Sequence, residues 1–586
     1  MEYSALVDIY RQVESTKKRT EITGYLASLL SRVPVDMIDI VAYLIQGKLH
    51  PDFMGIETGV AEKLAISSIS FATGIDEREI TADYVKTGDI GTAAENAVSR
   101  KKQKNLFSTP LTVERVYKNM DAIAKATGPG SQELKAKLLA ELLHDSTAEE
   151  AKYIARTVLG KMRLGVADMT ILDALATAFG AKEEREALVR AYSICSDIGR
   201  VARTIAESGL TGISGISITV GVPVQSMLAE RLPSIGEILE KMGGECAIEH
   251  KYDGLRVQIH LNRQENLFTI FTRRLENATS QFPDIRDAVE KAFTGKSCIL
   301  DGEAVPIDIY TGEFLPFQVI SRRRGRKNDV AKTSAEIPVC VFLFDCLLLD
   351  EKDLTTAPYI VRRRMLENVI SPSENVKLAQ RIVTSDAGEA EKFFSDAIDR
   401  GLEGIVAKST GPESVYKAGA RGWLWIKYKK DYKSEMNDTV DLTVVGAFAG
   451  KGRRAGGYGA LLLASYNHED DVYETVCKLG SGFDDATVSQ LPKMLENARI
   501  NSPYHKLRTK TNADFWFEPS LIAEVIGAEI TLSPIHTCCF GKAKAGAGLA
   551  IRFPRFTGRW RTDKQPTDIN TSASILQLYR QQLKKV

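Results

Sequence analysis

Residues 249–256 read E-H-K-Y-D-G-L-R and place Lys251 between two acids, Glu249 and Asp253. If 247–253 form a strand, alternate side chains share a face, so these three residues point the same way. Gly254 then permits a tight turn, because it has no Cβ to clash. A lysine amine becomes a nucleophile once it has lost its proton. The segment therefore predicts a lysine placed for covalent chemistry at the end of a strand.

The alternation continues after the glycine. Leu255, Val257, Ile259 and Leu261 would lie on one side of a second strand, with polar residues on the other. We therefore predict a hairpin with one apolar face and one face of charged and polar residues that could carry the chemistry. Taken alone, the K-x-D-G pattern fits an exposed strand of mixed charge equally well, because short motifs have many false positives.

Further short motifs follow in a fixed order along the chain. They are T-R-R at 272–274, L-D-G-E at 300–303, L-F-D at 343–345, L-E-G-I-V at 402–406, W-I-K-Y-K at 425–429, R-F-P-R at 552–555 and R-T-D-K at 561–564. Together with K-Y-D-G, the set resembles the covalent nucleotidyltransferases, which comprise DNA ligases, RNA ligases and mRNA capping enzymes. So many ordered matches are not expected by chance.

The resemblance is strongest to ATP-dependent DNA ligases of the archaeal and eukaryotic replicative type, and it covers almost the whole chain. The segment 161–165 resembles their DNA-binding domain, and 451–459, 478–483 and 529–534 resemble their C-terminal domain. One departure is Gln225-Ser226, where this family usually has a basic residue and proline. This departure puts a local contact in doubt.

The resemblance implies a role for each motif residue. Lys251 would be the catalytic residue that bonds covalently to AMP, and ATP would be the cofactor. The nucleotide-binding residues would be Glu249 at the adenine edge, Phe344 stacked on the base, Glu303 near the ribose, and Arg256, Arg273, Arg421, Lys427 and Lys429 as further contacts. Alone, Glu303 and Glu403 would each fit a salt-bridged surface glutamate, and Phe344 would fit a core aromatic.

Charge supports part of this assignment. Lys427 and Lys429 stand two apart on one expected strand, so they can share a face and suit the α-phosphate. Nearby cations also favour the neutral form of a lysine amine. Glu303 and Glu403 are hard oxygen donors of the kind that Mg²⁺ prefers. By resemblance, Arg552, Arg555 and Lys564 would orient the departing pyrophosphate.

Length and composition describe an ordinary globular protein. The chain has 586 residues, 44% hydrophobic and 26% charged, with a net charge of +1. Its start lacks the apolar core of a signal peptide, and it has no apolar run long enough to span a bilayer, so we expect a cytoplasmic protein, nucleoid-associated in a prokaryote. The eight cysteines show no zinc or disulfide spacing, which predicts buried, reduced thiols.

The pattern along the chain predicts three domains. Residues 1–215 read as an all-α DNA-binding domain, with Ser131 as an N-cap candidate before a leucine-rich helix. Residues 216–432 mix strands and helices, as an α+β adenylation domain would. Residues 433–586 alternate short strands with glycine-rich turns, which suits a β-barrel of the OB-fold type. The polar segment 430–437 is a candidate hinge.

The expected partner is nicked duplex DNA, bound by a monomer without membrane contact. Because the net charge is small, affinity for DNA must come from local basic runs, such as 421–433 and 322–327, although the second run also fits a solvated loop. Gln103, Leu106 and Phe107 resemble the sliding-clamp (PCNA) binding motif of archaeal ligases. The alternative is a loop whose Leu106 and Phe107 pack on their own domain.

Two other functions stay open at this point. One is an RNA ligase or a capping-type guanylyltransferase, against which the helical domain and the last motif argue. The other is a catalytically dead scaffold that clamps DNA, against which the intact Lys251, Glu303 and Glu403 argue. The sequence also leaves open the use of NAD, ADP or GTP in place of ATP.

Overall fold

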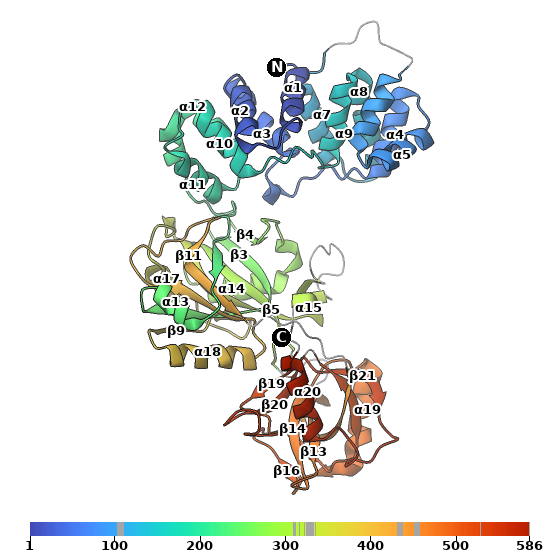
Figure 1. Ribbon diagram of the computed structural model, residues 1–586, viewed down its shortest axis with the longest axis vertical. Coiled ribbons are helices and arrows are strands. Elements are labelled where there is room, and N and C mark those ends of the chain that lie inside the picture. The colour runs from blue at the N-terminus through green and yellow to red at the C-terminus, as the bar shows by residue number, and fades with distance from the viewer. Residues whose placement is uncertain are drawn as a thin grey trace.

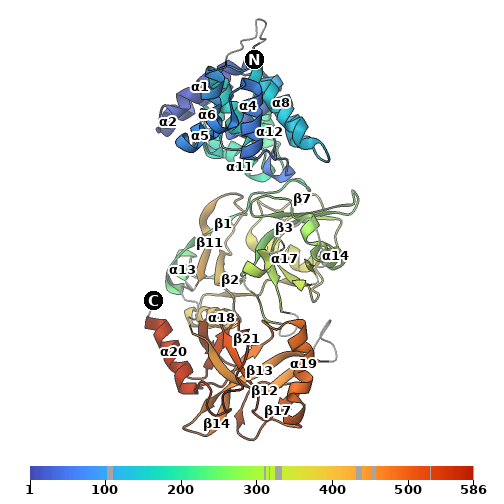
Figure 2. The same ribbon diagram turned by 90° about the vertical axis from the view of Figure 1, so that its right-hand side faces the viewer.

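The computed structural model describes residues 1–101, 110–308, 312–315, 317–321, 323, 333–334, 336–429, 438–449, 457–527 and 529–584. Three bodies follow one another along its long axis, a helical one, a mixed one and a β-rich one (Figures 1 and 2). Among the described residues, no helix is both long enough and apolar enough to cross a bilayer.

The N-terminal body is helical, as predicted. Its elements are α1 (Tyr3–Glu14), α2 (Arg19–Leu30), η1 (Val35–Met37), α3 (Ile38–Gln46), η2 (Asp52–Met54), α4 (Glu62–Thr73), α5 (Glu77–Thr87), α6 (Ile90–Ser99), α7 (Val113–Lys125), α8 (Ser131–Asp145), α9 (Ala148–Val158), α10 (Asp168–Ala178), α11 (Arg185–Cys195) and α12 (Ile198–Ser214). Leu139, Leu142 and Leu143 of α8 are buried, although Leu134 is exposed, and both leucines of α10 are buried, which is why these segments fold as helices. The predicted cap was wrong by one residue, because Gly130 is the N-cap of α8 and Ser131 is its first residue.

The middle body contains two sheets with helices on their outer faces. Its elements are β1 (Leu228–Arg231), α13 (Ile235–Lys241), β2 (Cys246–Lys251), β3 (Leu255–Asn262), β4 (Leu267–Thr272), η3 (Thr279–Gln281), α14 (Pro283–Ala292), β5 (Ser297–Pro306), α15 (Phe317–Ser321), β6 (Val339–Leu349), β7 (Lys352–Asp353), α17 (Tyr359–Val369), β8 (Val376–Leu378), β9 (Arg381–Thr384), α18 (Ala387–Asp399), β10 (Gly404–Ser409) and β11 (Arg421–Lys429). One sheet has the order β1-β11-β10-β2-β9. The other has the order β4-β3-β5-β6-β7, with β8 beside β6.

The predicted hairpin was wrong, because β2 and β3 belong to different sheets. The chain crosses between the sheets at residues 252–254, where Tyr252 is buried and stacks on Phe342 with ring centroids 4.0 Å apart. A Cβ on Gly254 would lie 2.4 Å from the carbonyl oxygen of Ala304, so only glycine fits this crossing. The alternation of β3 was right, since its apolar residues enter the core.

The polar side of β3 is buried as well. Gln258 accepts a hydrogen bond from the backbone N–H of Val224 at 2.8 Å and donates one to its carbonyl at 3.0 Å. The backbone N–H of Gln225 donates to Ser193 O at 2.7 Å, next to the end of α11. This segment, in which Gln225-Ser226 departs from the family pattern, therefore joins the helical body to the middle body.

The C-terminal body is β-rich. Its elements are β12 (Val440–Ala449), β13 (Tyr458–Asn467), β14 (Val472–Leu479), α19 (Asp485–Leu495), η5 (Glu496–Ala498), β15 (Arg499–Ile500), β16 (Leu507–Arg508), β17 (Phe515–Phe517), β18 (Ile522–Ile526), β19 (Glu529–Ser533), β20 (Gly548–Arg552), β21 (Arg555–Trp560) and α20 (Ser572–Lys584). Its main sheet has the order β15-β17-β12-β13-β14-β16, β18 joins β12 to β21, and β19 pairs with β20.

A buried ion pair joins strand, helix and loop in the middle body. Arg362 of α17 and Asp345 of β6 have no exposed side-chain surface, and their two N–O contacts are 2.7 and 3.0 Å long. Arg362 Nη1 also donates to the carbonyl oxygens of Ala357 and Ser414, at 2.7 and 2.9 Å. All of these contacts depend on the one guanidinium.

We expect Arg362→Met to destabilise the protein by about 3–5 kcal/mol, because it leaves a buried carboxylate without its cation. Denaturant unfolding followed by tryptophan fluorescence measures this, and Trp425 of the middle body is a reporter. The control is Arg286→Met in the exposed Arg286–Glu290 pair, where we expect a change within about 0.5 kcal/mol. Adding Asp345→Leu to Arg362→Met should recover part of the lost free energy of unfolding. Equal stability of the wild type and Arg362→Met would contradict the prediction.

Candidate active site

A cavity of about 610 Å³ lies between the two sheets of the middle body. The predicted residues that line it are Glu249, Lys251, Arg256, Arg273, Glu303, Phe344, Glu403, Arg421, Lys427 and Lys429. They come from β2, β3, β5, β6 and β11, from the turn after β4 (Arg273) and from the turn before β10 (Glu403). The fold thus brings every predicted catalytic, nucleotide and metal residue to one place, apart from the last motif.

Lys251 ends β2 and forms an ion pair with Glu403. Lys429 Nζ lies 3.8 Å from the same carboxylate. Gly404 pairs with Lys251 on one side and with Lys429 on the other. A Cβ on Gly404 would lie 2.3 Å from Tyr428 O, so glycine at this position lets three strands bring the two lysines to one carboxylate. Opposite charge on Glu403 holds the Lys251 ammonium in the cavity.

Lys427 adds to this cationic wall. Burial, followed by the charges of Arg421, Lys429, Lys251 and Arg273, lowers the pKa of the Lys427 amine. The strand therefore concentrates positive charge where a phosphate would need it.

Three carboxyl groups, those of Asp253, Glu303 and Glu403, line the cavity with Lys251. Burial raises the pKa of Glu303 to about 8, against the opposing effect of Lys251 and Arg256. Burial and the neighbouring Glu403 raise the pKa of Asp253, which also accepts a hydrogen bond from Phe317 N–H at 3.2 Å. In contrast, Lys251 holds the pKa of Glu403 below its usual range, although burial opposes this. Crowded carboxyls of this kind suit a divalent cation, because its charge would replace their protons.

Glu249 lies at the other end of the cavity and is nearly buried. The Tyr359 hydroxyl donates to its Oε1 at 2.5 Å, Arg363 Nη1 is 3.4 Å from that oxygen, and Lys408 Nζ is 2.6 Å from its Oε2. The Lys408 amine also lies 4.7 Å from the centre of the Phe344 ring and 4.4 Å from that of Trp425. This end of the cavity is aromatic with one buried acid, which suits a heterocyclic base with an amino group.

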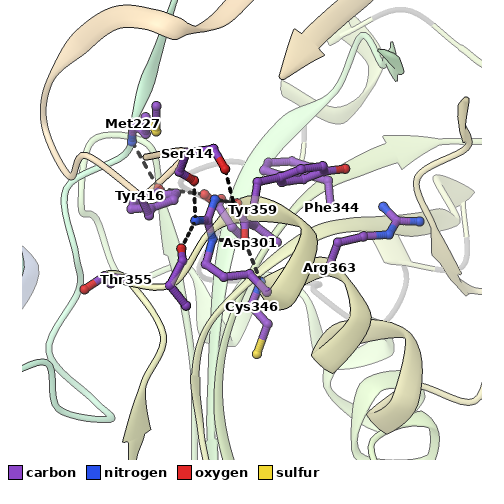
Figure 3. Close-up of polar contacts among 12 residues, drawn as sticks. Met227, Asp301, Phe344, Cys346, Thr355, Tyr359, Arg363, Ser414 and Tyr416 are labelled. Carbon is purple, nitrogen blue, oxygen red and sulfur yellow. Dashed lines mark hydrogen bonds and ion pairs between the residues drawn. The ribbon is translucent and has the colours of Figure 1, made fainter. Parts of the chain in front are cut away.

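Arg256 is tied to the wall beneath Phe344. It pairs with Asp301 at 2.6 Å and donates to Met227 O at 2.8 Å. The Tyr416 hydroxyl donates to Asp301 at 2.8 Å and accepts from Met227 N–H at 3.0 Å. Figure 3 shows Met227, Asp301 and Tyr416 in this cluster, with Tyr359 and Phe344 nearby. Arg256 is therefore preorganised by its own protein contacts.

Sequence reasoning missed five residues here, Asp301, Tyr359, Arg363, Lys408 and Tyr416. For Lys408 a signal existed, because alternation after Gly404 places residue 408 on the same face of β10 as Val406. Asp301 stood inside the L-D-G-E motif but was given no role. The two tyrosines and Arg363 reach the site through contacts between distant parts of the chain. Local sequence patterns do not predict such contacts.

The last-motif residues lie away from the cavity. A Cβ on Gly401 would lie 2.2 Å from Arg552 Nη2, which places Arg552 beside the end of α18. Arg555 begins β21, and Lys564 Nζ contacts Asp441 at 2.6 Å. In this arrangement the C-terminal body does not bring Arg552, Arg555 or Lys564 to Lys251.

The basic run 322–327 is described only at Arg323, which is buried and pairs with Asp284 at 2.6 Å. For this residue the DNA-contact prediction was wrong, because a guanidinium enclosed by Asp284 and backbone carbonyls cannot reach a phosphate. Gln103, Leu106, Phe107 and the candidate hinge 430–437 lie outside the described residues.

All eight cysteines are free and buried, as predicted.

Comparison with known proteins gives three family matches. Residues 2–176 match the family described as "DNA ligase N terminus", 226–429 match "ATP dependent DNA ligase domain" and 454–564 match "ATP dependent DNA ligase C terminal region". The protein named DNA ligase from Caldivirga maquilingensis is 47% identical over 595 residues, covering 100% of this chain and 98% of that protein. Those from Pyrobaculum islandicum and Thermoplasma volcanium are 49% and 46% identical, each covering 100% of this chain and 99% of the relative.

We expect Glu303→Gln to flatten the pH dependence of stability. The Glu303 carboxyl has a pKa of about 8 in the fold against an ordinary value of 4.5, so between these values the folded protein keeps a proton that the unfolded chain releases. Stability should fall as pH rises through this window, and the variant should lose this part of the fall. Thermal midpoints of the nucleotide-free protein at a series of pH values measure it. The exposed Glu57→Gln is the control, and parallel curves for Glu303→Gln and wild type would contradict the assignment.

Proposed function

Because the chain belongs to the family of ATP-dependent DNA ligases, we propose that it seals nicks in duplex DNA through a Lys251–AMP intermediate. It is an enzyme that ligates DNA, and full-length similarity to DNA ligases does not support the RNA ligase, guanylyltransferase or scaffold alternatives. The observation that carries the assignment of Lys251 is its position in the cavity, with the Glu403 carboxylate and Lys429 beside it.

The first step forms a phosphoramide. The Lys251 amine, having lost its proton, attacks the α-phosphorus of ATP; a P–N bond forms, and the bond from that phosphorus to the pyrophosphate oxygen breaks. Lys427 and Lys429 stabilise the charge that builds on the phosphoryl oxygens. Glu249 accepts a hydrogen bond from the amino group of adenine, and Phe344 stacks on its ring. Holding the base in this way sets the distance from the α-phosphorus to the Lys251 amine.

The next two steps use the same pocket. A 5′-phosphate oxygen at the nick attacks the bound AMP, the P–N bond breaks, and the Lys251 nitrogen regains a proton. The neighbouring 3′-hydroxyl then attacks the 5′-phosphate, which forms the phosphodiester bond and releases AMP. Arg273 and Arg421, at the cavity wall, suit contacts with the nucleotide or the DNA backbone.

Mg²⁺ is the proposed metal cofactor. Glu303 and Glu403, with Asp253 beside them, would hold it through hard oxygen ligands. When bound, the ion supplies positive charge that offsets the charge of the phosphates.

We propose further that the C-terminal body is an OB-fold barrel that swings toward the cavity, bringing Arg552, Arg555 and Lys564 to the pyrophosphate. The antiparallel β12–β13–β14 order, with a buried hydrophobic cluster on each face of these strands, supports the barrel. Movements of whole domains are common where one pocket serves successive steps. The protein would act as a monomer around duplex DNA in the cytoplasm, associated with the nucleoid in a prokaryotic cell.

Lys251→Ala should abolish covalent labelling by α-labelled ATP, because the variant has no amine to form the P–N bond. It should still seal some pre-adenylated nicks, since the last step does not use that amine as a nucleophile. Denaturing gels measure the label, and the exposed Lys352→Ala is the matched control. Covalent label that persists in Lys251→Ala would contradict the assignment of Lys251 as the adenylated residue. Transfer of label from GTP instead would point to a capping-type enzyme.

Phe107→Ala should remove stimulation of nick sealing by the sliding clamp and leave unstimulated sealing unchanged. The reason is that an aromatic side chain of this motif would anchor in a groove of the clamp. Sealing rates with and without clamp measure this, with Lys104→Ala as the control. Undiminished stimulation in Phe107→Ala would show that the segment 103–107 serves its own domain.

A further inference from the structure

Two adjacent cysteines lie in the loop between β19 and β20 of the C-terminal body. Cys539 has φ +50°, a left-handed conformation that is uncommon outside glycine. The backbone N–H of Cys538 donates to Thr475 O of β14 at 3.1 Å, and Leu549 N–H of β20 donates to Cys538 O at 2.8 Å. The cysteine pair is therefore held in place from both sides.

Glu474 of β14 points at this pair. Its side chain is nearly buried; its Oε2 accepts from Cys539 N–H at 2.9 Å and its Oε1 accepts from Asn467 Nδ2 at 3.1 Å. One ligand atom from each of Glu474, Cys538 and Cys539 lies within 4.8 Å of the other two. Among the described residues this is the one group of three such side chains so close together.

We propose that Cys538, Cys539 and Glu474 bind one divalent cation of the zinc class. Two sulfurs and one carboxylate oxygen suit a borderline-soft ion such as Zn²⁺ or Cd²⁺ and do not suit Mg²⁺. A tetrahedral ion with metal–sulfur bonds of about 2.3 Å needs its ligand atoms about 3.8 Å apart. The observed separations of at most 4.8 Å require only a small closing of side chains.

The site is open to a cation from solvent. Glu474 and Cys539 line a cavity of about 560 Å³, with Arg508, Lys510 and Lys542 on its wall. Water in this cavity can complete a fourth ligand position on the side where Glu474 and Cys539 line it, while Cys538 lies buried behind them. The opening also means that the ion need not be trapped during folding.

Metal binding at this site releases protons and leaves a net charge that nearby cations meet. Binding forms two metal–sulfur bonds and releases two thiol protons, one of which Cys539 now directs at Ser572 O at 3.0 Å. Two thiolates, one carboxylate and a divalent ion leave one negative charge. Arg508, 3.6 Å from Glu474, and Lys542, whose charge acts on Cys539, lie near this charge, and they also pair with Asp470 and Glu469.

The ion would be structural. Of the residues in this group, none lines the nucleotide cavity, and the group joins β14, the β19–β20 loop and the start of α20. We therefore expect occupancy to stabilise the C-terminal body without taking part in nick sealing. No sequence pattern indicates this site, because the two cysteines show no zinc spacing and Glu474 is distant in the chain.

The test uses the full chain, stripped with a chelator and dialysed against Zn²⁺ in excess Mg²⁺. We expect one zinc per chain by elemental analysis and a raised thermal midpoint, both lost in Cys538→Ser/Cys539→Ser. Cadmium in place of zinc should give an ultraviolet thiolate-to-metal band with the wild type only. Cys195→Ser, which removes another buried thiol in the helical body, is the matched control.

Glu474→Gln separates loss of a ligand from loss of fold. Glutamine keeps the size and one carbonyl oxygen, so this variant should fold and should bind zinc at least about tenfold more weakly, as expected when a metal site is impaired. Sealing activity of all variants should match wild type. Absence of zinc from the wild type, or equal zinc in wild type and the double variant, overturns the proposal.

Discussion

Buried carboxylates persist in a protein interior only when cations and hydrogen-bond donors meet them, and the middle body depends on this constraint. Glu249 meets Lys408 and Arg363, Asp301 meets Arg256, and Asp345 meets Arg362. These pairs join strands of both sheets to α17 and to the loop around Ser414. Because these ion pairs hold the strands that line the cavity in place, the two sheets can enclose a polar space instead of packing directly against each other.

This arrangement explains which parts of the site were predictable. Alternation along 247–251 placed Glu249 and Lys251 on one face correctly, because a strand repeats every two residues whatever surrounds it. The hairpin failed because strand pairing is decided by distant partners. A local sequence pattern does not predict that β10 and β9 pair with β2, or that Gly254 packs against Ala304. Tyr359 and Tyr416 were missed for the same reason, since their partners lie more than a hundred positions away.

The domain pattern was readable for a different reason. Helical periodicity in the first third, and short strands between glycines in the last, are local properties that burial reinforces. The arrangement of the three bodies is not local. One set of motif residues gathers around Lys251, whereas Arg552 lies beside Gly401 and Lys564 pairs with Asp441. The three last-motif residues therefore do not join the group around Lys251 in this arrangement, and the proposed role of the last motif requires the C-terminal body to move.

The raised pKa of Glu303 ties the proposed metal site to acid–base chemistry. In that site, a cation that takes this carboxylate as a ligand would send its proton to the buffer. The heat of association recorded by calorimetry would then contain the ionisation enthalpy of that buffer, and its slope across several buffers would count the protons displaced.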